Sequence, residues 1–215
     1  MEKRRYSAAL RTEQMALTRG RVLEVAGRMF VEQGYLGTTL NGIAKTAGVS
    51  VQTIYNTVGG KSALLKVVYD VTLAGDDEPV PMAQRPVFQA MIQAKTGREF
   101  LNHYAAIARH LNERVQPLVS MVLAQAATGD PDLRAFAETI EGERATGTAN
   151  AAGHLAQHFG LRDGLDTEDA ADILWTLTAP DLARRLVAER SWTWDRYQAW
   201  LATTMTDAVL APQAL

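Results

Sequence analysis

Apolar residues recur with helical spacing along most of the chain. An i, i+3, i+4, i+7, i+8 pattern places five of them on one face of a first helix: Val22, Val25, Ala26, Met29 and Phe30. The pattern then predicts short helices over about 40–47 and 51–57 and a longer one over 61–73. No segment shows the sustained alternation of a strand, so the fold class predicted is all-α.

The second part of the chain also has helical periodicity. Its helices are expected over these ranges: about 85–94, 97–112, 114–128, 131–159, 167–188 and 194–210. Asp130 followed by Pro131 is a typical helix start, and Thr193 is the expected N-cap of the last helix. Pro180 should kink or split the helix over 167–188, because proline cannot donate the backbone hydrogen bond of a helix interior.

The loop around Gly75 to Pro81, with two prolines and three acidic residues, separates these two helical parts. We therefore expect three parts: a basic N-terminal arm over 1–15, a first helical domain over 16–76, and a second helical domain over 77–215.

The composition narrows the class of protein. The chain has 215 residues, of which 47% are hydrophobic, enough for a sizeable core. It contains no cysteine, which excludes disulfides, thiolate nucleophiles and cysteine-ligated metals, and no apolar run reaches the length of a membrane span. These features predict a cytoplasmic protein.

The net charge of -2 hides an asymmetry along the sequence. Residues 1–66 carry a net charge of +6, whereas residues 67–215 carry -8. A local positive field can attract a polyanion even when the whole protein is acidic. The same division can also arise by chance, so charge alone does not establish a nucleic-acid partner.

The segment from Thr38 to Tyr55 has the residue types that a helix-turn-helix needs. Ala44 is small enough for two helices to approach closely, and Gly48 permits the left-handed conformation of a sharp turn. Ser50 is a natural N-cap for the second helix, while Ile43 and Ile54 are expected to point inward. An ordinary corner between two helices, with no role in DNA binding, remains the alternative.

The region from Val22 to Leu65 resembles the N-terminal domain of TetR-family transcriptional regulators. The resemblance rests on these residues: Ala26, Phe30, Gly34-Tyr35, Thr38-Thr39, Ile43-Ala44, Ala47-Gly48-Val49-Ser50, Thr53-Ile54-Tyr55, Lys61 and Leu64-Leu65. Val58 stands where the family usually has Phe, and Gly59-Gly60 precede Lys61 where the family usually has a short polar residue. The resemblance implies a three-helix DNA-binding domain, joined by a fourth helix to an all-helical domain for ligand binding and dimerisation. The first would be the domain over 16–76, with its helix-turn-helix motif over 39–58, and the second the domain over 77–215.

The resemblance also implies which residues contact DNA. Thr39, Tyr55 and Lys61 would contact phosphates, and Ser50 lies at the start of the recognition helix. The residues that would face the major groove are Val51, Gln52, Thr53 and Asn56. Gln pairs well with adenine, and Val or Thr can touch the thymine methyl group. A basic segment at the N-terminus, Lys3, Arg4 and Arg5, is either a minor-groove arm or a solvated tail.

The acidic part of the chain has polar and aromatic residues scattered over apolar helices, as a small-molecule pocket in a helical bundle requires. The candidates are Tyr104, His110, Met121, Gln125, His154 and Trp175. His154 and His158 have a spacing that a metal could use, but no third ligand accompanies them, so no metal and no cofactor are predicted. No catalytic constellation stands out, and an enzyme is not expected.

These expectations combine into one function. The chain should be a one-component transcriptional regulator, a repressor that leaves a pseudo-palindromic operator when a small-molecule effector binds. A two-fold operator requires a homodimer, for which the apolar segments 167–188 and 194–210 are the expected interface. The alternative is an all-α enzyme or small-molecule-binding protein whose helical corner does not bind DNA.

Overall fold

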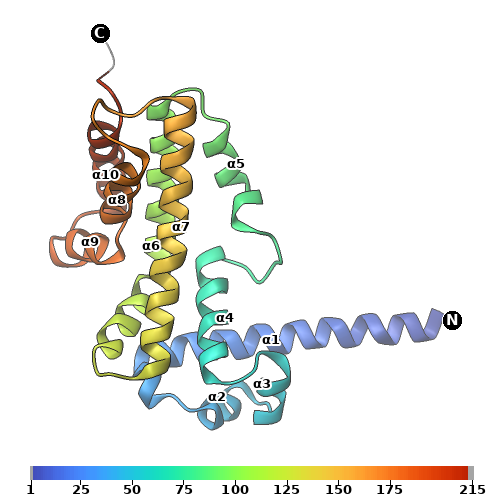
Figure 1. The fold of residues 1–215 in the computed structure, drawn as a ribbon. Helices are drawn as coiled ribbons and strands as arrows, with labels where there is room; N and C mark the ends of the chain where they lie inside the picture. The colour runs from blue at the N-terminus through green and yellow to red at the C-terminus, as the bar shows by residue number, and fades with distance from the viewer. Residues whose placement is uncertain (1, 213–215) are drawn as a thin grey trace. The chain divides into compact units, whose positions relative to one another are not determined.

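The protein is all-helical in the computed structural model, which describes the backbone of residues 2–212 and the side chains of residues 10 and 12–212. The helices run in this order: α1 Glu2–Gly37, α2 Leu40–Ala47, α3 Val51–Thr57, α4 Lys61–Ala74, η1 Met82–Gln84, α5 Pro86–Ile92, α6 Gly97–Ala126, α7 Pro131–His158, α8 Thr167–Leu177, α9 Pro180–Arg184, the π-helical turn η2 Arg185–Glu189 and α10 Trp194–Val209 (Figure 1). The described residues include no strand, so the predicted fold class is confirmed.

The chain forms two compact units. The first contains the residues up to Asp77 together with Pro117–Phe136, and the second contains Glu78–Gln116 together with the chain from Ala137 onward. Helices α6 and α7 therefore contribute residues to both units.

The first unit is built around α1, which packs against α2 and α4. The apolar face predicted for the first helix is buried, with Val22, Ala26 and Phe30 fully inaccessible to solvent. Ile43 of α2 and Leu64 of α4 are also fully buried, so three helices contribute to this core. Burial of aliphatic and aromatic side chains removes apolar surface from water and stabilises the arrangement.

A corner at Gly34 ends the regular part of α1. Gly34 has a φ of 75° and a ψ of 164°, a conformation that essentially only glycine adopts. The buried Thr38 then closes the corner, because its Oγ1 donates to the carbonyl of Gly34 at 2.7 Å. The corner redirects the chain into α2.

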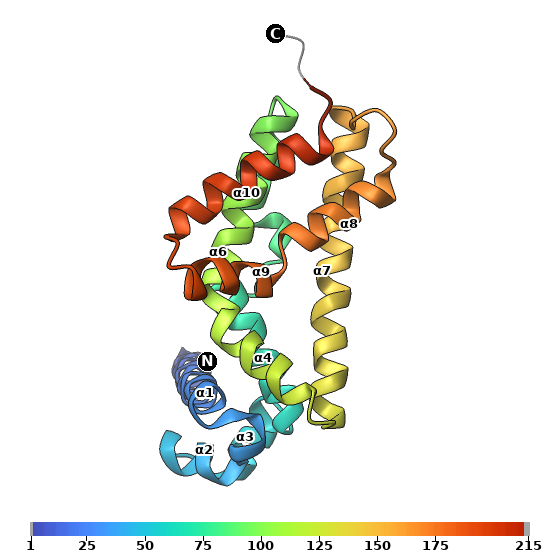
Figure 2. The same cartoon turned by 90° about the vertical axis from the view of Figure 1, so that its left-hand side faces the viewer.

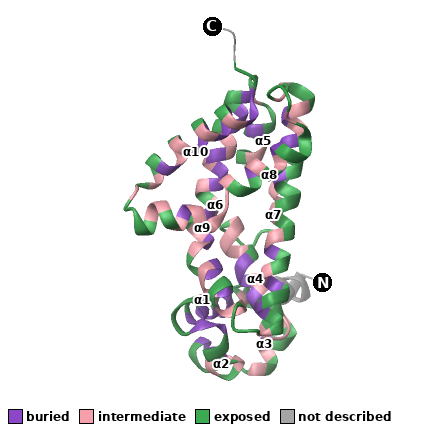
Figure 3. Cartoon of the chain, turned by 60° about the vertical axis from the view of Figure 1, so that its left-hand side comes forward, coloured by how far each residue is buried: buried purple, intermediate pink, exposed green. Residues whose placement is uncertain are grey.

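The second unit packs the last helices, α8 and α10, beside the residues of α6 and α7 that belong to it (Figure 2). Its core contains Phe100 and Leu101 of α6, Leu155 of α7, Leu174 of α8 and Tyr197 of α10, none of which is exposed to solvent. Along these helices buried positions recur among exposed ones, as expected for amphipathic helices (Figure 3).

Of two breaks predicted between helices, one is absent from the structure and the other is present. The two helices expected over 97–112 and 114–128 are one continuous helix, α6, which includes Pro117. The expected separation is wrong: no glycine stands near residue 113, and the side chain of Asn112, a residue type that can cap a helix, donates to the Thr178 carbonyl instead. Pro180 does split the 167–188 segment, as predicted, into α8 and α9, with the π-helical turn following.

Candidate nucleic-acid interface

The turn between α2 and α3 is fixed by three capping interactions. Thr39 is the N-cap of α2, and its Oγ1 accepts a hydrogen bond from the Gly42 amide at 3.0 Å. Gly48 ends α2 in the left-handed conformation, with a φ of 67°. Ser50 is the N-cap of α3, and its Oγ accepts from the Thr53 amide at 3.0 Å. These contacts hold two short helices in a fixed relation, as a helix-turn-helix requires.

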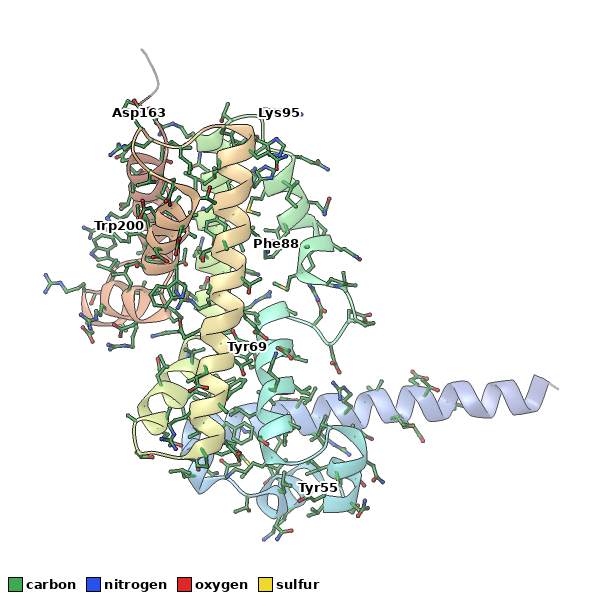
Figure 4. All side chains as sticks on the ribbon, in the orientation of Figure 1. Tyr55, Tyr69, Phe88, Lys95, Asp163 and Trp200 are labelled. Atoms are coloured by element: carbon green, nitrogen blue, oxygen red, sulfur yellow. The ribbon has the colours of Figure 1, made fainter. Side chains whose placement is uncertain are left out.

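Helix α3 has one buried side and one exposed side. Ile54 is fully buried and anchors the helix, whereas Gln52 and Asn56 are exposed and Tyr55 is 52% exposed (Figure 4). Val51 and Thr53 are half-buried at the edge of the same surface. The structure thus brings the predicted base-reading residues together on one helix.

Two of these side chains are already paired with each other. Gln52 Nε2 donates to Asn56 Oδ1 at 2.8 Å. The amide planes of both residues are therefore oriented before any ligand binds, and each keeps hydrogen-bonding groups for a base edge. The interaction was not anticipated from the sequence, although its i, i+4 spacing allows it.

Lys61, the first residue of α4, lies over an aromatic ring. Its Nζ is 4.1 Å from the ring centroid of Tyr35, a cation–π distance. The Tyr35 hydroxyl in turn donates to Asp132 Oδ2 at 3.0 Å. Burial lowers the pKa of Lys61, while Asp130 and Asp132 oppose that effect. Lys61 is thus held within the first unit by an aromatic and acidic environment that the sequence did not reveal.

Of the two glycines before α4, Gly59 is favoured by the backbone conformation at its position. Gly59 has a φ of 95°, in the left-handed region, and its amide donates to the carbonyls of Ile54 and Tyr55. Gly59 therefore closes the C-terminal end of α3. Gly60 is the N-cap of α4 and provides no side-chain cap.

Arg19 is a residue of the interface region that sequence reasoning missed. Its Nη1 donates to the carbonyl of Thr57, at the end of α3, at 3.2 Å. Its Nε is also 2.6 Å from Asp77 Oδ2. Arg19 therefore ties α1 to the C-terminal end of α3. The side chains of Lys3, Arg4 and Arg5, predicted as a basic arm, lie outside the described residues.

The six candidates for a ligand pocket are not gathered in one unit. Met121 and Gln125 belong to the first unit, where Gln125 Oε1 accepts from the Leu36 amide at 3.2 Å. Gln125 thus supports the corner after Gly34, a structural role that the sequence did not suggest. The other four candidates belong to the second unit: Tyr104, His110, His154 and Trp175.

These four residues have different surroundings. Burial raises the pKa of Tyr104 to about 12, and the Tyr104 ring lies 6.3 Å from that of Phe100. His154 also stacks on Phe100, at 4.8 Å. His110 is exposed, and Trp175 is 37% exposed, with the Arg144 guanidinium 5.0 Å from its ring. Tyr104 and His154 are therefore the two candidates close to the core of this unit.

His154 and His158 are close enough to interact, with ring centroids 4.3 Å apart. Burial lowers the pKa of His154, and the nearby His158 lowers it further. Within the described part of the chain, no group of three or more potential ligand side chains could hold a metal ion.

The second unit contains a polar cluster that was not predicted from the sequence. Asn112 is buried on α6, and its Nδ2 donates to the Thr178 carbonyl at 3.3 Å. Burial raises the pKa of Tyr197, on α10, to about 12, and the side chains of Asn112 and Arg144 lie close enough to lower it in part. These residues come from three helices, so no local spacing could have identified them. Only the presence of Asn within an apolar stripe hinted at such a cluster.

The chain therefore has a helix-turn-helix whose second helix has one exposed side, followed by an all-helical unit. Residues 22–68 match the sequence model described as "Bacterial regulatory proteins, tetR family". The resemblance to the TetR family is therefore confirmed: the chain carries a TetR-type N-terminal domain. No curated protein sequence matches the chain.

Solved structures with the same fold extend over nearly the whole chain. The SmeT–triclosan complex is 20% identical, with a TM-score of 0.70, covering 92% of this chain and 93% of that one. A TetR transcriptional regulator from Chloroflexus aurantiacus is 17% identical, with a TM-score of 0.64 and coverage of 93% and 100%. A protein from Saccharomonospora viridis in complex with choline is 18% identical, with a TM-score of 0.63 and coverage of 90% and 98%. The chain thus has the fold of TetR-family regulators.

Among the described residues, no helix is both long enough and apolar enough to cross a bilayer.

Proposed function

We propose that this protein is a one-component transcriptional repressor. As a homodimer it binds a pseudo-palindromic operator through its two α3 helices, and a small-molecule effector releases it. In this proposal residues 16–76 bind DNA and residues 77–215 respond to the effector and dimerise. The alternative of an enzyme or binding protein with an unused helical corner is not favoured by the family match.

The observation that carries the proposal is the exposed side of α3. Gln52, Tyr55 and Asn56 are exposed to solvent on α3, beside a turn that is fixed by the N-caps of both helices. Exposed amide and hydroxyl groups at the start of such a helix are suited to base edges and phosphates in the major groove.

The residues proposed to contact DNA form two groups: one contacts phosphates and positions the domain, and the other contacts bases. Thr39, Ser50, Tyr55 and Lys61 would position the domain on phosphates, with Thr39 and Ser50 at helix N-termini where amides also favour anions. Val51, Gln52, Thr53 and Asn56 would read bases. Lys61 must then exchange part of its contact with Tyr35 for a phosphate.

The effector site is proposed for the interior of the second unit. Tyr104 and His154, with the missed residues Asn112, Arg144 and Tyr197, place polar groups beside an apolar core. Pockets for small molecules combine these two features. Structures of the same fold hold triclosan in one case and choline in another, which supports a small-molecule effector without identifying it.

The homodimer is proposed to form through the outward surfaces of α8 and α10. Several apolar residues expected at that interface lie in the core of their own unit instead: Leu174, Tyr197, Leu201 and Met205. The outward residues are Trp175 on α8 and Ala199 and Thr203 on α10, which are exposed. Trp200 also projects away from α6 and α7 (Figure 4).

Selection of fragments from genomic DNA, followed by binding measurements, tests the proposal. The protein should enrich a small set of fragments that share a two-fold symmetric sequence. Gln52→Ala should weaken binding to such a fragment by about 1–3 kcal/mol and binding to random DNA very little. Lys66→Ala, which removes a lysine paired with Asp70, is the matched control and should change neither. Equal losses on both DNAs with Gln52→Ala would contradict base reading by this residue.

A further inference from the structure

The second unit contains a cavity at the place where α6 begins and α10 ends. Its volume is about 140 Å³, and its lining residues are Arg98, Arg162, Thr206, Asp207, Leu210, Ala211 and Pro212. Lys95 and Asp163 mark this region in Figure 4. An engineered cavity of ~150 Å³ accommodates benzene, so this space suits a molecule of roughly six non-hydrogen atoms.

The charges around the cavity favour an anion. Arg98 and Arg162 contribute two guanidinium groups, and Asp207 contributes one carboxylate. Among the described residues, neither guanidinium takes part in an ion pair or a side-chain hydrogen bond. Two unpaired guanidinium groups at one cavity are suited to an oxyanion, because their N–H groups match the geometry of carboxylate and phosphate oxygens.

A buried hydroxyl group at the cavity also lacks a partner. Thr206 is only 6% exposed, lines the cavity, and has an Oγ1 with no hydrogen-bond partner. A buried hydroxyl without a partner destabilises the folded state, and a bound acceptor would remove that cost. This residue is separate from the polar cluster proposed for the effector.

The walls of the cavity are held in place by packing. A Cβ built on Gly97 would lie 2.9 Å from both methyl carbons of Leu210, so α6 and the end of α10 are in close contact. The Arg162 amide donates to the Val209 carbonyl at 2.9 Å and fixes the loop after α7 against α10. The lining residues therefore need little rearrangement to receive a ligand, which lowers the cost of binding.

We propose that this cavity is a binding site for a small organic oxyanion, separate from the effector site. The carboxylate of the ligand lies between Arg98 and Arg162, and Leu210 contacts its carbon atoms. Asp207 accepts a hydrogen bond from a hydroxyl or amino group and repels a second anionic group. The ligand class is thus a small hydroxy- or amino-monocarboxylic acid, with phosphate as the other source of the same oxyanion chemistry.

Calorimetric titration of the full-length protein without DNA tests this site with two probes, lactate and inorganic phosphate, at constant ionic strength. At least one probe should bind with a Kd tighter than about 10 mM. Arg98→Ala or Arg162→Ala should weaken that binding at least about tenfold, because each removes charge-assisted hydrogen bonds. Arg190→Ala, which changes an exposed arginine elsewhere in the unit, should leave it unchanged. Binding of lactate supports a carboxylate ligand, and binding of phosphate alone supports the phosphate source.

Thr206→Val supplies a second measurement that does not depend on the arginine variants. It keeps the shape of the side chain and removes the hydroxyl, so the free protein should melt at the same or a higher temperature while affinity for the probe falls severalfold. Absence of binding by both probes overturns the proposal. Binding that is unchanged in the Arg98, Arg162 and Thr206 variants also overturns the proposal. Because no DNA is present, neither result depends on the proposed repressor function.

Discussion

Lys61 shows how a single residue can have two environments. In the free protein its ammonium group lies over Tyr35, whose hydroxyl is bound to Asp132. The family resemblance assigns the same ammonium group to a DNA phosphate. The sequence identified this residue and Tyr35, but it could not show that Asp130 and Asp132, more than sixty residues further along the chain, lie beside them.

Lys61→Ala should weaken binding to all DNA sequences to a similar extent. It removes one phosphate contact, so the slope of log K against log salt should become shallower by about one unit. The measurement is a titration of operator and random DNA at several salt concentrations, with Lys66→Ala as the control. An unchanged slope would remove Lys61 from the phosphate contacts.

Gly34 and Gly48 differ in the strain that a side chain would cause. Both have a positive φ, but a Cβ on Gly34 would lie 1.9 Å from Gln125 Nε2, whereas a Cβ on Gly48 would meet nothing within 4 Å. Gly48→Ala should therefore cost only about 1–2 kcal/mol of unfolding free energy, for the left-handed conformation. Gly34→Ala should cost more for two reasons: its φ and ψ are essentially restricted to glycine, and Gln125 must also give up its contact with Leu36.

Urea denaturation of both variants measures this difference. In a Gln125→Ala background the cost of Gly34→Ala should become smaller, since the obstructing side chain is gone. A cost that stays the same in that background would show that Gln125 does not constrain Gly34.

At the scale of the elements, the sequence predicted what local spacing encodes. The boundaries of α2 and α3, the capping roles of Ser50 and Thr193 and the break at Pro180 all follow from nearby residues. The contribution of Pro117–Phe136 to the first unit does not, because it depends on contacts between distant parts of the chain. For the same reason the sequence predicted which side of α3 is exposed, but not that the ligand candidates lie in two different units.

Packing of the helices in the second unit also determines a pH dependence. Burial raises the pKa of Tyr104 and of Tyr197 from 10.0 to about 12, so the folded state favours their neutral forms. Stability from this source is complete below about pH 10 and is lost as the pH rises toward about 12. Each tyrosine contributes a slope of at most about 1.4 kcal/mol per pH unit in that window.

Denaturation at a series of alkaline pH values tests this expectation. Tyr104→Phe should make the loss of stability with pH shallower, because one titrating group is removed. Tyr55→Phe, at an exposed position of α3, is the control for loss of a hydroxyl. If Tyr104→Phe leaves the alkaline slope unchanged, burial of this phenol does not contribute to it.

For the whole molecule, binding to a two-fold operator requires a dimer. Two recognition helices can occupy successive major grooves only when a two-fold axis relates them.

Thr203 on α10 and Thr146 on α7 are both exposed. Each hydroxyl donates to the carbonyl four residues earlier, Thr203 to Ala199 and Thr146 to Gly142. The two threonines are therefore closely matched in local structure.

Thr203→Arg should give a helical monomer with weak operator binding, because it places a large charged group from each subunit in the proposed interface. Thr146→Arg should leave the dimer intact. Light scattering and circular dichroism measure the two properties. A monomeric wild-type protein at micromolar concentration, or a Thr203→Arg variant that still dimerises, would contradict the proposed interface.

A hydroxyl-radical footprint of the protein on a genomic fragment that it selects tests directly whether paired α3 helices bind a two-fold operator. Two α3 helices in successive major grooves should protect two related patches on one face of the duplex, with centres about 10 base pairs, or 34–36 Å, apart. Gln52→Ala should weaken both patches together, since each subunit contributes one copy of the helix. A single protected patch, or protection that does not depend on α3, would show that paired α3 helices do not read a two-fold operator.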